Sequence, residues 1–127
     1  MKSSLQIILF ISTFFAFVPS IASAETRLLM FETKGCYWCD RWHEEVGKIY
    51  AKSPEGKIAK LKRVPITKSR NSEYELNSIV IYSPTFVLVD NKKEIGRIEG
   101  YPGADFFWGL LEKMIIKLEK TKNGNSN

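Results

Sequence analysis

Apolar and polar positions in the first half of residues 25–127 predict a strand followed by a helix. Arg27–Glu32 holds four apolar residues in a row, which is typical of a central strand buried on both faces. A helix is expected next, because apolar residues recur at intervals of three and four positions along one face. These residues are Cys39, Trp42, Val46, Ile49 and Tyr50. Pro54 and Gly56 then predict the end of this helix and the start of a loop.

The second half of the chain begins with a weaker strand signal and leads to a strong one. Leu61–Lys68 has the pattern of a strand, and its Pro65 indicates an edge position or a bulge. Ser72–Ser78 is expected to form a short helix. Ser83–Asp90 is the clearest strand, because β-branched and aromatic residues follow one another up to a turn at Asp90–Lys93.

The remaining residues predict a hairpin partner and a closing helix. Glu94–Glu99 is expected to return beside the preceding strand, and an apolar stripe at helical spacing follows. The stripe consists of Phe107, Leu110, Leu111, Met114, Ile115 and Leu118. Residues 121–127 are polar and are expected to form a flexible tail. The order of elements predicts one α/β domain over residues 25–120, a mixed four-stranded sheet flanked by helices on both faces.

Residues 1–24 have the layout of a secretory signal peptide. Lys2 provides a positive charge, Leu5–Val18 is a mainly apolar run, and the small residues Ala22–Ala24 mark a cleavage site. An uncleaved membrane anchor is the alternative, because no charged residue follows Lys2 within this segment. Cleavage after Ala24 would release an exported, periplasmic domain with no stable membrane insertion.

The charge of the chain narrows the choice of partner. It has 19 basic and 14 acidic residues, a net charge of +5, and the two signs are interleaved from Lys34 to Lys122. Such mixing is typical of a solvated surface, so nucleic acid is not an expected partner. We expect a monomer that acts on another protein.

The only two cysteines, Cys36 and Cys39, lie three positions apart. A haem attachment motif requires histidine directly after the second cysteine, where this chain has Asp40. A structural zinc site requires four ligands, and the chain has a single histidine. A disulfide that closes so short a loop would add little stability. A redox-active pair and a copper(I) site, for which two thiolates suffice, remain open.

A redox pair would divide the chemistry between its two sulfurs. Cys36 comes just after Gly35, at the expected start of a helix, where unpaired backbone N–H groups favour a thiolate. Cys39 shares the apolar stripe of the helix and is expected to be buried. We therefore expect Cys36 to form a mixed disulfide with a partner and Cys39 to resolve it. Tyr37 and Trp38 lie between the two cysteines. Adjacent residues of a helix point about 100° apart, so at least one of the two is expected at the contact surface.

A second feature is the pair Ser83 and Pro84 at the start of the strongest strand. A cis peptide bond there would redirect the chain and expose the backbone N–H and C=O groups of Ser83. Placed beside Cys36, these groups could pair with an extended substrate segment. We therefore expect Ser83 and Pro84, together with Tyr37 and Trp38, to bind the substrate.

Three segments of the chain together resemble the thioredoxin superfamily, and more narrowly its small periplasmic members called SoxS, which are associated with bacterial sulfur oxidation. The segments are MFETKGCYWCDRWHEEVGKIY, YSPTFVLVD and GRIEGYPGADFFWGLLEKM. The resemblance implies a thioredoxin fold and a reductase that removes disulfides from a periplasmic partner, with a separate electron donor. It also implies that Cys36 is the nucleophile, Cys39 the resolving thiol and Pro84 a cis-proline, with no cofactor and no metal.

One position departs from the family. Thioredoxins usually have a buried aspartate six residues before the first cysteine, where it serves the proton transfers of the resolving thiol; here that residue is Met30. Glu32 and His43 are the available substitutes, and the sequence assigns neither of them a catalytic role. Two other functions stay open: a copper(I) chaperone that uses the same cysteines, and an interaction domain whose disulfide remains closed.

Overall fold

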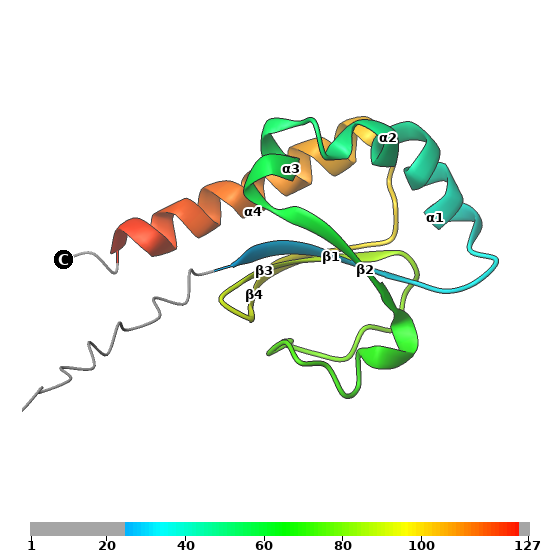
Figure 1. Cartoon of the computed structure of the whole chain (residues 1–127), viewed down its shortest axis with the longest axis horizontal. Coiled ribbons are helices and arrows are strands. Elements are labelled where there is room, and N and C mark those ends of the chain that lie inside the picture. Colours follow the sequence, from blue (N-terminus) through cyan, green and yellow to red (C-terminus); the bar gives the residue numbers. More distant parts are fainter. Residues whose placement is uncertain (1–24, 125–127) are drawn as a thin grey trace, which may run out of the picture.

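The computed structural model describes residues 25–124, which form one sheet with helices packed on it (Figure 1). The strands are β1 (Thr26–Glu32), β2 (Lys60–Pro65), β3 (Thr85–Asp90) and β4 (Lys93–Glu99). The first helical segment is continuous and consists of α1 (Tyr37–Trp42), the π-helix η1 (His43–Gly47) and α2 (Lys48–Tyr50). The other helices are α3 (Pro54–Ile58), the short 3-10 helix η2 (Ile66–Lys68) and the long α4 (Ala104–Gly124).

The sheet has the strand order β2, β1, β3, β4. β1 pairs in parallel with β2 and antiparallel with β3, and β3 and β4 form an antiparallel hairpin. The mixed four-stranded sheet expected from the sequence is therefore confirmed, but the α-helices lie on one face of it and not on both (Figure 1). β2 lies at an edge, as its proline indicated, but it ends at Pro65, and the rest of the predicted strand Leu61–Lys68 forms η2.

The central strand β1 is buried on both faces, because its alternate side chains enter two different apolar clusters. Leu28 and Met30 belong to the cluster beneath the helices, whereas Leu29 and Phe31 belong to the cluster on the opposite face. The strand β3 alternates in the same way. This arrangement explains why both strands are near-continuous apolar runs in the sequence.

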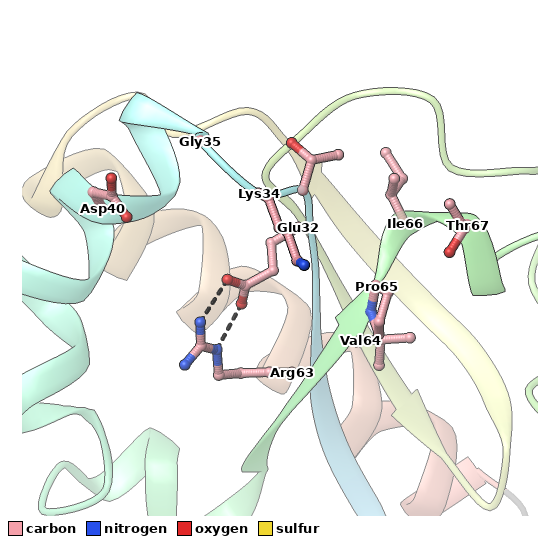
Figure 2. Close-up of a pocket in the computed structure, with 10 residues that line it drawn as sticks. Glu32, Lys34, Gly35, Asp40, Arg63, Val64, Pro65, Ile66 and Thr67 are labelled. Atoms are coloured by element: carbon pink, nitrogen blue, oxygen red, sulfur yellow. Dashed lines mark hydrogen bonds and ion pairs between the residues drawn. The ribbon is translucent and has the colours of Figure 1, made fainter.

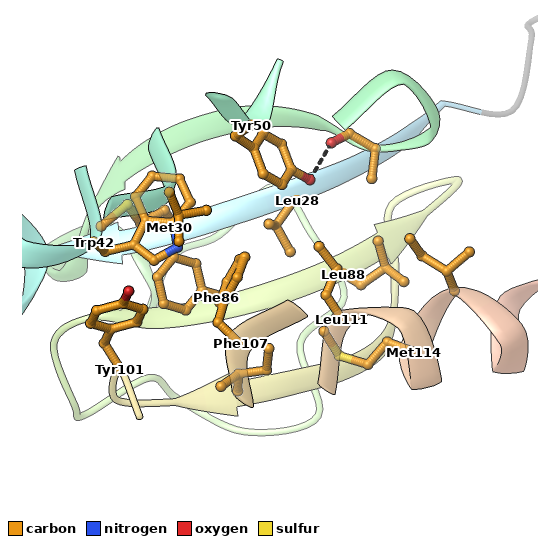
Figure 3. Close-up of a cluster of buried hydrophobic side chains, with 14 of the residues drawn as sticks. Leu28, Met30, Trp42, Tyr50, Phe86, Leu88, Tyr101, Phe107, Leu111 and Met114 are labelled. Carbon is orange, nitrogen blue, oxygen red and sulfur yellow. Dashed lines mark hydrogen bonds between the residues drawn. The ribbon is translucent and has the colours of Figure 1, made fainter. Parts of the chain in front are cut away.

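Trp42 lies in the cluster beneath the helices, toward the end that holds Tyr101 (Figure 3). Its ring centroid is 5.1 Å from that of Phe86 in β3 and 5.6 Å from that of Phe107 in α4. The hydroxyl of Tyr50, in the same cluster, donates to the carbonyl of Ala59 at 2.7 Å. The cluster therefore joins α1, α4 and the sheet directly behind the cysteine pair.

The face of the sheet away from the α-helices is covered by residues 66–84, which run below the sheet in Figure 1. The short helix predicted at Ser72–Ser78 is wrong. Tyr74 packs against the sheet from an irregular segment, and the N–H of Glu75 donates to the carbonyl of Lys92 at 2.8 Å. Hydrogen bonds to the β3–β4 hairpin therefore override the local helical pattern.

The π-helix η1 changes which residues face the core. A π-helical turn holds more residues than an α-helical one, so buried positions become spaced by four. After Cys39, the buried positions are Trp42, Val46 and Tyr50. Ile49, which was predicted on this face, is instead 53% exposed.

α3 occupies a stretch that the sequence predicted to be a loop. The Oγ of Ser53 accepts from the N–H of Gly56 at 2.9 Å and caps the helix, and Pro54 takes its first position. Gly56 also lies directly against the preceding helix, because a Cβ atom there would be 1.8 Å from the carbonyl oxygen of Tyr50. The proline therefore starts a helix here.

α4 extends past the predicted domain end at Lys120 and continues to Gly124. The hydroxyl of Thr121 donates to the carbonyl of Lys117 at 3.0 Å, and the ammonium of Lys122 lies 3.1 Å from the carboxylate of Asp90. These contacts hold the last turn, so the predicted tail boundary is too early. Of the predicted stripe, Leu110 is partly exposed, and the other members face the core.

Two expectations concern parts of the chain outside the described residues. The predicted signal peptide, residues 1–24, is one, and residues 125–127 of the predicted tail are the other. Within residues 25–124, none of the helices combines the length and the apolar character that crossing a bilayer requires.

Candidate active site

Cys36 and Cys39 form a disulfide where the chain passes from β1 into α1, with their sulfur atoms 2.07 Å apart. After Glu32, the last residue of β1, Gly35 turns the chain with a φ of +70°, a conformation that other residues rarely adopt. Cys36 then serves as the N-cap of α1, and Cys39 lies one turn inside it. The strand end and the helix start together fix both sulfurs.

The two cysteines differ in exposure. Cys39 is 2% exposed and belongs to the cluster beneath the helices, whereas Cys36 is only partly buried. The Sγ atom of Cys36 accepts from the backbone N–H of Cys39 at 3.2 Å, so it lies among the unpaired N–H groups of the helix start. The structure therefore places the sulfurs in the unequal positions that the sequence predicted.

Ser83 and Pro84 lie beside the disulfide, and the peptide bond between them is cis. The Ser83 hydroxyl oxygen is 3.3 Å from the Sγ of Cys36 and 3.3 Å from the Sγ of Cys39. It also accepts from the N–H of Thr33 at 3.0 Å. The sequence pointed only to the backbone of Ser83, so the contact of its side chain with both sulfurs is a further feature of the site.

Exposed apolar side chains adjoin the cysteine pair and Ser83 in the chain. Tyr37 is 61% exposed and Trp38 is 52% exposed, and their rings meet edge to face with centroids 5.1 Å apart. Ile81 and Tyr82 directly precede Ser83 and are 69% and 54% exposed. Tyr37 and Trp38 are predicted from the sequence, but Ile81 and Tyr82 are not, although two large apolar residues before a Ser-Pro pair are a usable signal. We call these four side chains the apolar rim.

A row of hydrogen-bonded side chains extends along the helix from Tyr37. Arg41 donates to the Tyr37 hydroxyl at 3.4 Å and to the Glu45 carboxylate, which also accepts from the Tyr101 hydroxyl at 2.5 Å. The hydrogen bond from Tyr101 lowers the pKa of Glu45, and that from Arg41 lowers it further. The row connects one member of the apolar rim to the loop before α4.

An ion pair between the largely covered Glu32 and the exposed Arg63 joins the ends of β1 and β2 (Figure 2). The Glu32 carboxylate accepts two hydrogen bonds of 2.7 Å from Arg63, and the His43 Nε2 atom lies 3.5 Å away from it. The Arg63 hydrogen bond lowers the pKa of Glu32, although burial opposes this effect. Met30, at the position where the family has aspartate, is fully buried among apolar side chains. Glu32 is thus the ionised carboxylate that follows Met30 on the same strand.

A pocket of about 620 Å³ opens beside this ion pair. On the side of the turn that leads from β1 to Cys36, the pocket is lined by Lys34, Gly35 and Asp40. On the side of β2 it is lined by Val64–Thr67 (Figure 2). The pocket therefore lies next to the turn that carries Cys36.

Potential metal ligands are few near the cysteine pair. Within residues 25–124, no three histidine, cysteine, aspartate or glutamate side chains are grouped so that they could hold a metal ion. A copper(I) ion would depend on the sulfurs of Cys36 and Cys39 in their reduced state.

Comparison with known proteins adds to this geometry. No protein-family model and no curated protein matches the chain. Among solved structures, it is similar to the periplasmic thioredoxin SoxS from Paracoccus pantotrophus in its reduced form, with 42% sequence identity and a TM-score of 0.70. The match covers 74% of this chain and 99% of SoxS.

More distant similarities show the same fold. Thioredoxin-2 of a malaria parasite is 24% identical, with a TM-score of 0.53 and coverage of 71% of this chain and 84% of that chain. Fasciola hepatica thioredoxin is 19% identical, with a TM-score of 0.53 and coverage of 71% and 81%. The mixed sheet, the disulfide between strand and helix, and the similarity to SoxS agree, so this chain belongs to the thioredoxin superfamily and is a thiol-disulfide oxidoreductase with a CxxC pair.

Proposed function

We propose that this chain is a periplasmic reductase, in which the dithiol form of Cys36 and Cys39 passes electrons to a disulfide of a partner protein. The unequal placement of the two sulfurs carries the proposal. Cys36 is partly exposed at the N-cap of α1, whereas Cys39 is 2% exposed one turn inside the helix. Such placement suits a pair in which one sulfur meets the partner and the other releases it.

In the first step, the thiolate of Cys36 attacks one sulfur of the partner's disulfide. A bond forms between these two sulfurs, the partner's S–S bond breaks, and its second sulfur leaves as a thiolate that takes a proton from solvent. The Cys39 N–H and the Ser83 hydroxyl lie 3.2 and 3.3 Å from the Cys36 sulfur. Both groups can donate to a negative charge on that atom, which stabilises the attacking thiolate.

In the second step, the thiol of Cys39 loses its proton and attacks the sulfur of Cys36. The Cys36–Cys39 bond forms, the mixed disulfide breaks, and the partner's first sulfur leaves as a thiolate. Two electrons have then moved from the cysteine pair to the partner. The closed disulfide in the structure corresponds to this end state, and a separate electron donor must return the pair to two thiols.

The partner would dock on the apolar rim and on the start of β3. Tyr37 and Trp38 would pack against apolar side chains of the partner, and the backbone of Ser83 would pair with an extended segment beside Cys36. Pro84 would border the sulfurs on the same side. These contacts require no cofactor and a single copy of the chain.

Two observations support the location and the class of partner. Residues 1–24 have the pattern of an export signal. The 42% identical SoxS is a periplasmic thioredoxin. The resemblance to SoxS proteins also favours a partner protein that belongs to a sulfur-oxidation system.

The reduction potential of the Cys36–Cys39 couple, measured in glutathione buffers, tests the direction of exchange. A reductase should have a potential below about −230 mV, closer to the range of thioredoxins than to that of strong oxidants. Reduction of insulin, followed with a chemical electron donor, should accompany this value. A potential near about −120 mV, together with efficient oxidation of a reduced substrate protein, would show that the chain is an oxidant.

The copper(I) alternative needs its own measurement, because any pair of thiolates binds this ion to some extent. The copper(I) affinity of the reduced protein is therefore measured in competition with a strong copper(I) chelator at defined free metal. Tight copper binding without disulfide exchange would overturn the proposed function. Exchange activity with weak copper binding supports it.

A further inference from the structure

The outer edge of β2 is open in the described part of the chain. β2 is the edge strand next to β1, and within residues 25–124 no strand pairs with its other side. No backbone hydrogen bond from the loops reaches Lys60–Pro65 either, within the same range. Every second residue of β2 directs its backbone N–H and C=O groups to this side, and these groups can therefore pair with an additional strand.

The part of the chain that contains this edge, from α3 through β2 to the loop after η2, is also basic, and much of its charge has no partner. From Gly56 to Ser72 the sequence contains several basic residues and no acidic one. Lys62 pairs with Glu73 at 2.6 Å, and Arg63 pairs with Glu32. The others are exposed and form no ion pair within residues 25–124; they are Lys57, Lys60, Lys68 and Arg70.

The opposite edge of the sheet differs in charge. In β4, Glu94 and Arg97 form an ion pair with an N–O distance of 2.7 Å, and Arg97 also lies 3.8 Å from Glu99. The segment that includes Glu75 covers the beginning of β4 through a β-bridge to Lys93. Exposed Lys93 in β4 has no ion pair within residues 25–124 either, but acidic Glu94 and Glu99 share its strand, so unpaired positive charge without acidic neighbours is a feature of the β2 segment.

Two hollows include residues of β2 in their lining. One has a volume of about 430 Å³ and is lined by Lys57, Lys60 and Leu61. The other is the pocket of about 620 Å³ beside Arg63 and Pro65 (Figure 2). Leu61, Arg63 and Pro65 alternate along the strand and so face the same side of the sheet. Side chains at alternate positions of an added strand would therefore meet these hollows.

We propose that the outer edge of β2 is a docking site for an extended, acidic segment of a protein partner, which adds to the sheet as a further strand. Backbone hydrogen bonds would supply affinity, and the two hollows would accept alternate side chains. The unpaired lysines and Arg70 select acidic residues in the segment. β1 and β2 are parallel and end together, so a docked segment leads toward the pocket beside Cys36.

Docking at this edge requires no electron transfer, so it is tested with the disulfide closed. The probe is a fluorescein-labelled, cysteine-free peptide in which glutamate alternates with valine, and its counterpart has lysine in place of glutamate. Fluorescence anisotropy should show binding of the acidic peptide alone, with an affinity that falls as salt is raised. Within Lys60–Val64, amide hydrogen exchange should slow when the peptide is bound at the alternate N–H groups that point away from β1, because an added strand protects those groups.

The charge-reversal variant K57E/K60E/K68E/R70E should bind the acidic peptide at least about tenfold more weakly, equivalent to roughly 1.4 kcal/mol. The matched control, K48E/K52E/K113E/K120E, reverses exposed lysines on α2, the turn after it and α4, and should bind as the wild type does. A variant with glutamine at the same β2-edge positions should give an intermediate affinity. The glutamine variant replaces the charge-reversal variant in the test if charge reversal impairs folding.

Other outcomes would overturn the proposal. Equal loss of binding in both charge-reversal variants would mean diffuse attraction, and binding without slower exchange in β2 would mean that no strand is added. Binding to phosphatidylglycerol vesicles in place of the peptide would make this edge a membrane-facing surface. Lysines on an edge strand also prevent aggregation, so self-association of the variant without peptide binding by the wild type would assign them that role alone. Insulin reduction should be equal in all variants, so a failure of docking is distinct from a failure of the redox function.

Discussion

The hydroxyl of Ser83 contacts the Sγ atom of Cys36 at 3.3 Å, although the two residues lie 47 positions apart in the chain. A hydroxyl donates a stronger hydrogen bond to a thiolate than to a disulfide sulfur, because the thiolate carries charge. The contact therefore stabilises the reduced, ionised form of Cys36 more than the oxidised form.

Replacing Ser83 with alanine should make the cysteine pair more reducing. Loss of about 1 kcal/mol from the reduced form corresponds to a shift of about 20 mV toward negative potential. Alkylation of Cys36 at neutral pH should also become slower. Ser83→Thr keeps the hydroxyl and should restore both values, whereas an unchanged potential in the alanine variant would show that the contact has no redox role.

The roles of the two cysteines can be separated by single substitutions. Cys36→Ser should abolish exchange, because Cys39 is 2% exposed and cannot reach a partner. Cys39→Ser should accumulate a mixed disulfide through Cys36, visible on a non-reducing gel and removed by a reducing agent. Mass spectrometry of the briefly alkylated dithiol protein should find Cys36 modified first. Faster modification of Cys39 would reverse the assignment.

Two glycine-to-alanine substitutions should have opposite effects on stability. At Gly56 a Cβ atom would lie 1.8 Å from the Tyr50 carbonyl oxygen, so α3 must shift, and Gly56→Ala should cost about 1–3 kcal/mol or more. At Gly109, within α4, a Cβ atom meets nothing within 4 Å. Gly109→Ala should therefore stabilise the protein by about 0.5–1 kcal/mol. Urea denaturation of both variants measures these changes, and two effects of the same sign would contradict the packing at α3.

The ion pair of Glu32 should make stability depend on pH. The hydrogen bond from Arg63 lowers the pKa of Glu32 below its ordinary value of 4.5, so the unfolded chain binds the proton more readily than the folded one. The contribution of this carboxylate is therefore fully present above about pH 4.5 and is lost as the pH falls through the folded-state pKa.

Glu32→Gln should destabilise the protein at neutral pH, and the difference from wild type should shrink in acid. Thermal or urea unfolding measured between neutral and acidic pH follows this difference. Glu119→Gln, on the exposed side of α4, is the control and should leave the unfolding free energy nearly unchanged. A constant difference between Glu32→Gln and wild type at all pH values would show that the ion pair does not shift the titration.

The strands of this fold could be predicted because their signals are local. The apolar run ending at Phe31 and the run that begins at Thr85 each describe a strand buried on both faces. The helix at Pro54–Ile58 was missed because proline both ends and begins helices, and the Ser53 cap decides which. Ile49 was misplaced because nothing in the apolar spacing announces a π-helical turn.

The candidate site likewise contains features that local sequence predicts and features that depend on long-range packing. Cys36 and Cys39 are neighbours in sequence, so their positions on one helix, and the difference in their burial, follow from local pattern. The contact of the Ser83 side chain with both sulfurs depends on how β3 packs beside α1, a long-range relationship that no spacing expresses. The exposure of Ile81 and Tyr82, which directly precede Ser83, depends on the same packing.

The ion pair between Lys122 and Asp90 holds the end of α4 at the end of the sheet where β1 begins. Lys122 also lies 3.4 Å from the hydroxyl of Thr26, so the last turn of α4 meets the first residue of β1. β1 then runs for seven residues, about 20 Å, before it reaches the turn that carries Cys36. A retained anchor before Glu25, a fusion partner or a sensor surface would therefore hold the protein at the end remote from the disulfide. The fate of residues 1–24 changes where the protein is held, but not which end it offers to a partner.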